Sequence, residues 1–193
     1  MEIEFFHSLT LFKAFFNPFF STISFFGEHG LFFIVLSLIL MLFSKTRKVG
    51  FSMLLSLGIG ALFTNVIIKN FVQRVRPYNA SLKYNEYWLI AGKTIVGEYS
   101  FPSGHATSTT AVLMAVFMLT NKKYSWLSIV GILFMGASRV YLVVHYPTDV
   151  IGGFIVGGLS SLLGCYLVSL LFRWLNKNSN NKICNFLLNA SIF

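Results

Sequence analysis

The sequence predicts an all-α integral membrane protein, a bundle of five or six apolar helices. Of its 193 residues, 55% are hydrophobic and only 11% are charged. The mean hydropathy is +0.72. So few polar side chains cannot cover the surface of a water-soluble domain of this size. Long apolar runs also recur along the chain, each close to the ~20 residues that a helix needs to cross a bilayer. We therefore expect one helical membrane domain over residues 1–193.

The apolar runs define a helical core over residues 29–172, and they lie at 29–44, 49–68, 104–120, 124–144 and 150–172. The longest polar connection, 77–101, lies between the second and third runs. A connection of this length in a compact domain is usually functional. The core therefore carries one long segment that we expect to contribute to a site.

The two ends of the chain differ from the core. Residues 3–27 carry polar side chains at steps of three and four on a Phe-rich stretch, and Pro18 would kink a helix that spans there. We favour an amphipathic helix in the membrane plane over residues 1–28, with a sixth span as the alternative. Residues 173–193 are expected to form a polar cytoplasmic tail.

The net charge of +9 is concentrated in short segments between apolar runs. These segments contain Lys45, Arg47 and Lys48, then Lys122 and Lys123, then Arg173, Lys177 and Lys182. The pattern is that of cytoplasmic loops, so membrane topology explains the charge and we expect no nucleic-acid partner. Segments 69–103 and 145–149 then face the extracytoplasmic side.

The first candidate segment is KNFVQRVRP, at the end of the second apolar run. Lys69 and Arg76 are seven residues apart, so two turns of helix would put both on one face before Pro77 ends the helix. No carboxylate lies nearby in sequence, so the two cations indicate a bound anion. For Arg74 we favour a cation that reaches towards lipid head groups.

The second candidate segment is YSFPSGHATSTTAV. Pro102, Ser103 and Gly104 indicate a tight turn into a helix that Ser103 caps, with Gly104 allowing a ligand to approach the backbone. The free N–H groups at such a helix start suit a phosphate. His105 falls in the first turn, within reach of a leaving oxygen.

The third candidate segment is SRVYLVVHYPTDV, which contains the only aspartate of the chain. We expect Pro147 to begin a helix with Asp149 in its first turn, where the carboxylate orients His145. Arg139 offers a planar fork for phosphate oxygens. The remaining acids are glutamates without the spacing of a magnesium site, so we predict chemistry that needs no metal and no cofactor.

These three segments resemble the signature motifs of the type 2 phosphatidic acid phosphatase family, which is related to the vanadium haloperoxidases. The matching patterns are Lys69–x6–Arg76–Pro77, Pro102–Ser103–Gly104–His105 and Ser138–Arg139–x5–His145–x3–Asp149. The resemblance implies that His145 attacks phosphorus to form a phosphohistidine, that Asp149 orients it, and that His105 protonates the leaving group and then activates water. It also implies that Lys69, Arg76, Arg139, Ser103 and Gly104 hold the phosphoryl oxygens.

Several functions fit this resemblance. We expect hydrolysis of a lipid phosphate or pyrophosphate in the bacterial cytoplasmic membrane, at its extracytoplasmic face. Undecaprenyl pyrophosphate, phosphatidylglycerol phosphate and phosphatidic acid all fit as substrates, with a slight preference for the undecaprenyl carrier. The alternatives are vanadate-dependent halide oxidation, and lipid head-group binding or flipping without catalysis. The sequence leaves the oligomeric state open.

Overall fold

The computed structural model describes residues 13–27, 30–97 and 99–189, and these residues form helices and no strands. The N-terminal half contains α2 (Lys13–Gly27), α3 (Leu31–Met41), α4 (Arg47–Ala61), the π-helix η2 (Leu62–Ile68), α5 (Lys69–Val72), α6 (Pro77–Ala80) and α7 (Leu82–Ile90). The C-terminal half contains α8 (Gly104–Leu119), α9 (Lys122–Ser125), α10 (Leu127–Tyr141), α11 (Pro147–Lys177) and α12 (Lys182–Asn189). The predicted all-α class is therefore observed in the described part of the chain.

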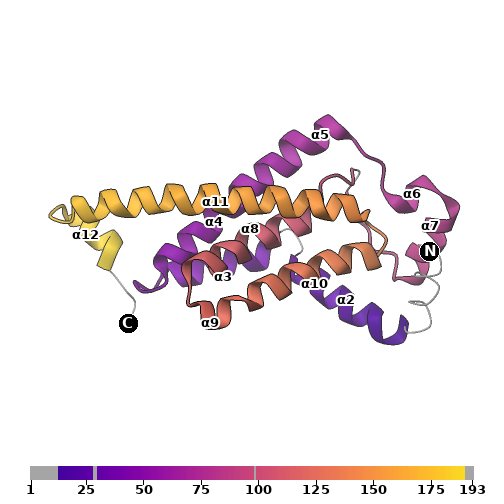
Figure 1. Ribbon diagram of the computed structural model, residues 1–193, viewed down its shortest axis with the longest axis horizontal. Helices are drawn as coiled ribbons and strands as arrows, with labels where there is room; N and C mark the ends of the chain where they lie inside the picture. The colour runs from indigo at the N-terminus through magenta and orange to yellow at the C-terminus, as the bar shows by residue number, and fades with distance from the viewer. Residues whose placement is uncertain (1–12, 28–29, 98, 190–193) are drawn as a thin grey trace.

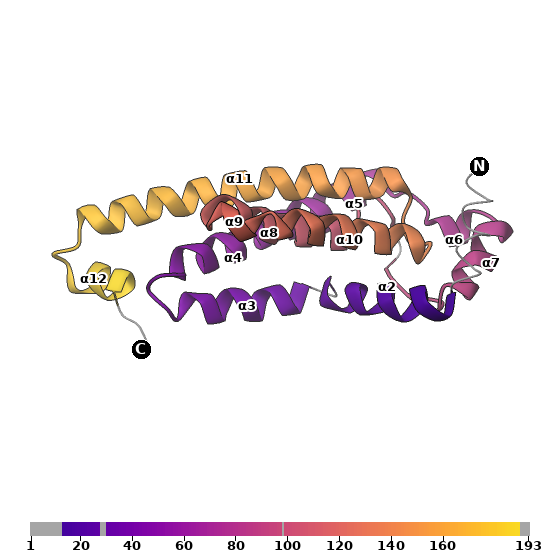
Figure 2. The ribbon, with the colours of Figure 1, turned by 60° about the horizontal axis from the view of Figure 1, so that its bottom comes forward.

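The helices form an elongated bundle in which α11 runs along most of the length (Figures 1 and 2). Helix α8 lies in the middle, packed against α4, α10 and α11. Helix α3 packs on α4, and α2 packs mainly on α10. The start of α8, the end of α10 and the start of α11 lie at the same end of the bundle as α6 and α7 (Figure 1). That shared end brings the three candidate segments together.

Glycines on α11 allow its close packing on α8 and α4. A Cβ at Gly157 would lie 2.5 Å from the Thr107 carbonyl oxygen, and one at Gly153 would lie 2.8 Å from the Ser103 carbonyl oxygen. Further along, a Cβ at Gly164 would lie 2.9 Å from the Ser56 amide nitrogen. Small residues at helix contacts are typical of membrane bundles, where backbones pack directly on one another. This packing fixes the start of α11 against the start of α8.

Fewer described helices have the length and composition of a membrane span than the sequence predicts. Two described helical stretches are long and apolar enough to cross a bilayer. They are Arg47–Ala80, which runs from the start of α4 to the end of α6, and Pro147–Lys177, which is α11. A third is obtained if α2 and α3, which are bent by 53°, count as one span. The 104–120 run forms α8, whose 16 residues are shorter than a usual span, and the 124–144 run is divided between α9 and α10. Five or six spanning helices therefore stay a prediction.

The two ends of the chain are described in part. Helix α2 contains Pro18 and follows the long direction of the bundle beside α10 (Figure 2). Its position relative to the membrane plane stays a prediction, and residues 1–12 and 28–29 of that expected helix lie outside the described residues. In the expected tail, α11 continues to Lys177, and Arg47 Nη1 donates to the Leu187 carbonyl of α12.

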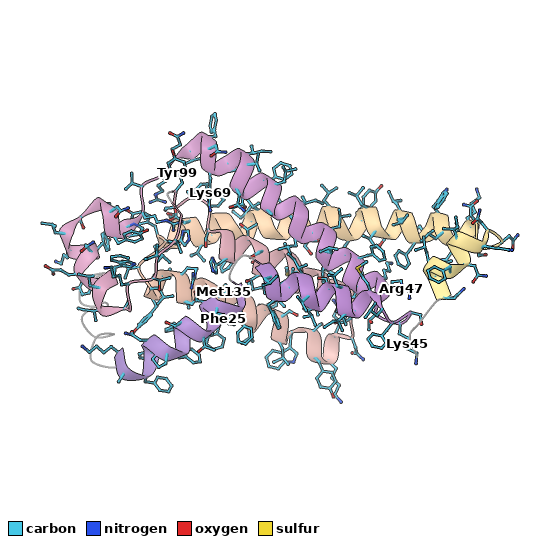
Figure 3. The ribbon with its side chains drawn as sticks, turned by 180° about the vertical axis from the view of Figure 1, so that it is seen from behind. Phe25, Lys45, Arg47, Lys69, Tyr99 and Met135 are labelled. Carbon is cyan, nitrogen blue, oxygen red and sulfur yellow. The ribbon has the colours of Figure 1, made fainter. Side chains whose placement is uncertain are left out.

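The basic connections lie away from the candidate site. In Figure 3, Lys45 and Arg47 lie towards the end of the bundle that carries α12, whereas Lys69 and Tyr99 lie at the other end. This separation of cationic loops from the candidate site matches the topology expected from the charge pattern.

Candidate active site

One cavity of about 810 Å³ gathers most of the predicted site residues. Its lining includes Lys69, Arg76, Gly104, His105, Arg139 and His145. The other two predicted residues lie directly behind this lining. Ser103 is fully buried at the start of α8, and Asp149 is fully buried in the first turn of α11. The three segments therefore meet in space as the sequence predicts.

Lys69 and Arg76 reach the cavity by a different route from the predicted one. Helix α5 ends at Val72, and Gln73 takes a left-handed conformation with φ of 48°. Arg76 then precedes α6 in an extended conformation. The expectation that both cations share two turns of one helix is therefore wrong. Helix α5 ends five residues before Pro77, and the chain turns there so that Arg76 enters the cavity from a loop.

Arg76 braces the loops around the site. Only 2% of its surface is exposed. Its Nε donates to the Gly97 carbonyl, Nη2 donates to the Tyr99 carbonyl at 2.8 Å, and Nη1 donates to the Val144 carbonyl at 2.8 Å. Arg76 thus joins the long polar connection to the residue before His145 and keeps a positive charge beside the His145 ring.

The start of α8 forms the expected anion-binding end. The Ser103 hydroxyl accepts from the Ala106 amide at 3.4 Å, so Ser103 is the predicted cap. A Cβ at Gly104 would lie 3.6 Å from Lys69 Nζ, so the lysine ammonium is close to the first turn of α8. Amide groups, helix dipole and ammonium combine here to favour a phosphate.

His145 is held between a carboxylate and a guanidinium. Its Nδ1 lies 3.6 Å from Asp149 Oδ2, slightly beyond hydrogen-bond distance, and its Nε2 lies 3.3 Å from Arg76 Nη1. A guanidinium only donates, so this contact requires an unprotonated Nε2 and places the ring proton on Nδ1, towards Asp149. In this tautomer Nε2 carries the lone pair, as the predicted attack on phosphorus requires.

Burial keeps His145 neutral. The pKa of His145 is lowered to about 4, mainly by desolvation and to a smaller extent by the cations Arg76 and Arg139, while Asp149 opposes the shift. An imidazole with this pKa is unprotonated at neutral pH and is available for attack.

Arg74 is a site residue that the sequence interpretation assigned wrongly to lipid head groups. Its Nη1 donates to Asp149 Oδ1 at 2.6 Å and to Thr148 Oγ1 at 2.7 Å. Its guanidinium also lies 4.0 Å from the centre of the Tyr146 ring. The carboxylate partner is 75 residues away in sequence, so no local pattern indicates this pair. The only available indication was position, two residues before Arg76.

Helix α2 also reaches the site, which no pattern in the sequence predicts. Ser24 and Gly27 of α2 line the cavity. A Cβ at Gly27 would lie 2.9 Å from His105 Cδ2 and 2.6 Å from Met135 Cε. Gly27 therefore makes room for the imidazole of His105, and α2 forms part of the wall around the predicted general acid.

Arg139 and the remaining lining complete the cavity. Arg139 is fully buried, and its Nε donates to the Ser138 hydroxyl at 3.2 Å. Segment 94–97 of the long connection and Asn65 of η2 contribute further lining. Apolar side chains of α3 and α4 continue the wall away from the cations, namely Ile34, Leu54 and Leu57. The cavity is cationic at one end and apolar at the other.

Fold and site together define a class: a helical membrane protein with a cavity that is lined by cations and two histidines. The chain belongs to the PAP2 superfamily, whose family description matches residues 34–179. The matched region contains all three motifs.

Similar proteins include several named lipid phosphatases. The chain is 36% identical over 134 residues to the undecaprenyl-diphosphatase of Sulfolobus acidocaldarius, covering 68% of this chain and 61% of that protein. It is 34% identical to phosphatidylglycerophosphatase B of Bacillus subtilis, covering 61% and 57% of the two chains. The chain therefore spans about three fifths of the length of these relatives.

Solved structures with the same fold include a Bacillus subtilis phosphatidylglycerolphosphate phosphatase of PAP2 type. It superposes with a TM-score of 0.61 at 27% identity, covering 83% of each chain. Aquifex aeolicus LpxE gives a TM-score of 0.63 at 21% identity, covering 77% of this chain and 84% of that one. The bundle is thus the fold of a transmembrane PAP2 phosphatase.

Proposed function

We propose that this protein hydrolyses a lipid phosphate or pyrophosphate through a phosphohistidine intermediate. The observation that carries the proposal is a cavity with Lys69, Arg76, His105, Arg139 and His145 at one end and apolar residues of α3 and α4 at the other. Such a cavity suits a substrate that is anionic at its head and apolar in its tail. Two histidines, one of them oriented by Asp149, supply what catalysis needs beyond binding.

The chemistry follows from the geometry. The Nε2 lone pair of His145 attacks phosphorus, and the bond between phosphorus and the leaving oxygen breaks as His105 donates a proton to that oxygen. His105 then accepts a proton from water, the water oxygen attacks phosphorus, and the P–N bond breaks to release inorganic phosphate and free His145. The surrounding cations and amides stabilise the charge on the phosphoryl oxygens in both steps.

The class of lipid is supported by the relatives named above, whose names include a polyprenyl diphosphate and a phosphatidylglycerophosphate as substrates. We favour the undecaprenyl carrier, with the other two lipids as further candidates. A diphosphate would place its second phosphate on the leaving side, at His105.

We infer that the site faces the extracytoplasmic side of the membrane. The basic segment at Lys45 and Arg47 lies away from the end that carries Lys69 (Figure 3). Cytoplasmic placement of the basic loops then leaves the cavity at the opposite face. A protease or thiol-labelling study of loop 77–101 in intact cells tests this orientation.

Phosphate release by the purified full-length chain is the direct test. Undecaprenyl diphosphate, phosphatidylglycerophosphate and phosphatidate would be assayed in detergent micelles, each with and without EDTA. We expect release from at least one lipid, unchanged by EDTA and abolished in His145→Ala. Full release by a clean His145→Ala preparation would disprove the nucleophile, and loss of release in EDTA would disprove the metal-independent mechanism.

A further inference from the structure

Asp149 has more partners than its part in a histidine–aspartate pair requires. Oδ1 accepts from Arg74 Nη1 at 2.6 Å. Oδ2 accepts from the Ser100 hydroxyl and from the Tyr146 amide at 2.9 Å, and it also faces His145 Nδ1. The side chain of Asp149 is fully buried. Both oxygens are therefore fixed, and the carboxylate cannot rotate about its own axis.

Arg74 and Ser100 act as one unit. The Ser100 amide donates to the Arg74 carbonyl at 2.8 Å, while the Ser100 hydroxyl and the Arg74 guanidinium hold different oxygens of Asp149. The Arg74 guanidinium is itself held by Thr148 Oγ1 and by the face of the Tyr146 ring. The arginine fork is thus fixed on three sides, as a positioning group needs to be.

From this geometry we infer that Arg74, together with Ser100, is a positioning residue that keeps Asp149 ionised and turned so that Oδ2 faces His145. The inference rests on the proposed function of the site and adds a residue at an unspecified position of the first motif. Arg74 acts through Asp149 and does not line the cavity, so it does not hold the phosphate. It is therefore distinct from Lys69, Arg76 and Arg139.

The charge of Arg74 also limits the basicity of His145. Arg74 binds the carboxylate that would otherwise interact more strongly with the imidazole. The charged groups that face His145 are Asp149, Arg76 and Arg139, with Lys69 and His105 on the same cavity wall. Removing Arg74 takes away the cation that is hydrogen-bonded to Asp149, so the carboxylate favours protonation of the imidazole more strongly. The acid limb of kcat/KM then moves to higher pH.

The test compares Arg74→Gln with Arg74→Lys and with the control Lys83→Gln, which removes an exposed cation from α7 at the same end of the bundle. The probe is dioctanoyl phosphatidate in micelles with the purified full-length chain. We expect Arg74→Gln to lower kcat by about 10- to 100-fold with little change in KM, by analogy with the loss of a group that orients a metal-binding histidine. Arg74→Lys should restore part of kcat, and Lys83→Gln should match the unaltered protein.

Two further readouts separate positioning from a structural tie. The acid limb of kcat/KM should move to higher pH in Arg74→Gln, since substrate ionisation is the same for all variants. In an Asp149→Asn background, Arg74→Gln should lower kcat by less than about 3-fold further, because both changes disable the same carboxylate and such effects are not additive.

Three outcomes would overturn the inference. The first is an unchanged kcat in folded Arg74→Gln. The second is an Arg74→Gln preparation in which fewer molecules are active but the pH profile of kcat/KM is unchanged. The third is a double variant in which the losses of kcat from Arg74→Gln and Asp149→Asn multiply. If the unaltered protein itself releases no phosphate from any probe, the proposed function fails instead, so the two failures are distinguishable.

Discussion

Replacing Asp149 with asparagine tests the catalytic pair most directly, because the change alters charge and hydrogen bonding but not size. With the amide nitrogen at the Oδ2 position, the Tyr146 amide and His145 Nδ1–H each face a donor. His145 then relieves the conflict by moving its proton to Nε2, which removes the lone pair that attacks phosphorus. With the amide nitrogen at the Oδ1 position, it faces Arg74 Nη1 at 2.6 Å.

Either orientation has a cost that can be estimated. A wrong histidine tautomer or a lost orienting group lowers kcat by about 100- to 10,000-fold in other enzymes. A buried donor without an acceptor also costs about 1–3 kcal/mol of stability. Arg74 is partly exposed and retains access to water, so we expect the loss of stability to lie at the low end of its range.

Rapid-quench measurement of acid-labile phosphohistidine, with thermal unfolding in detergent, separates the two effects. We expect slow phosphohistidine formation in Asp149→Asn in a protein that still folds. Glu86→Gln is the matched control, since it makes the same chemical change at an exposed site on α7. A normal rate of phosphohistidine formation in Asp149→Asn would refute the role of the carboxylate in orienting His145.

Three other predictions follow from the site. First, the acid limb of kcat/KM falls near pH 4 instead of 6.5, because burial lowers the pKa of His145 to about 4 and only the neutral ring attacks. By the same linkage, the unfolded chain binds more protons between those pH values, so stability decreases as pH falls from 6.5 to 4 and His145→Gln removes that slope. Second, Gly27→Ala lowers kcat by about 10-fold or more, because its Cβ would lie 2.9 Å from His105 Cδ2 and displace the acid. Third, Gly58→Leu slows hydrolysis of long-chain lipid phosphates but spares dioctanoyl phosphatidate, since Gly58 lines the cavity and its Cβ would meet nothing within 4 Å.

Each of these predictions has a contrary result. An acid limb near 6.5 after correction for substrate ionisation would mean that His145 is not held neutral by burial. Full activity in Gly27→Ala would mean that α2 does not constrain His105. Gly158→Leu is the control for the third, because its Cβ also meets nothing within 4 Å but it does not line the cavity. Equal effects of the two leucines would exclude a lipid chain along α4.

Much of the site was predictable because each motif is local. Ser103 caps α8, His105 lies in its first turn, and Asp149 lies in the first turn of α11, as the turn residues Pro102 and Pro147 indicate. Hydropathy likewise predicted the helical class. The path from Lys69 to Arg76 was not predictable in this way. Position 73 has a left-handed backbone conformation, which a glycine usually marks, but the residue there is a glutamine.

The sequence by itself determined that this is a helical membrane protein whose candidate site residues come from three short segments. Composition indicates whether the chain folds in a membrane or in water, and local residue spacing indicates where helices begin. Both can therefore be predicted without a structure. Only the tertiary structure decided which groups meet across long separations. It assigned Arg74 to Asp149, Gly27 to His105, and the apolar wall of α4 to the same cavity as the cations. Such contacts depend on how whole helices pack, and no local pattern encodes them.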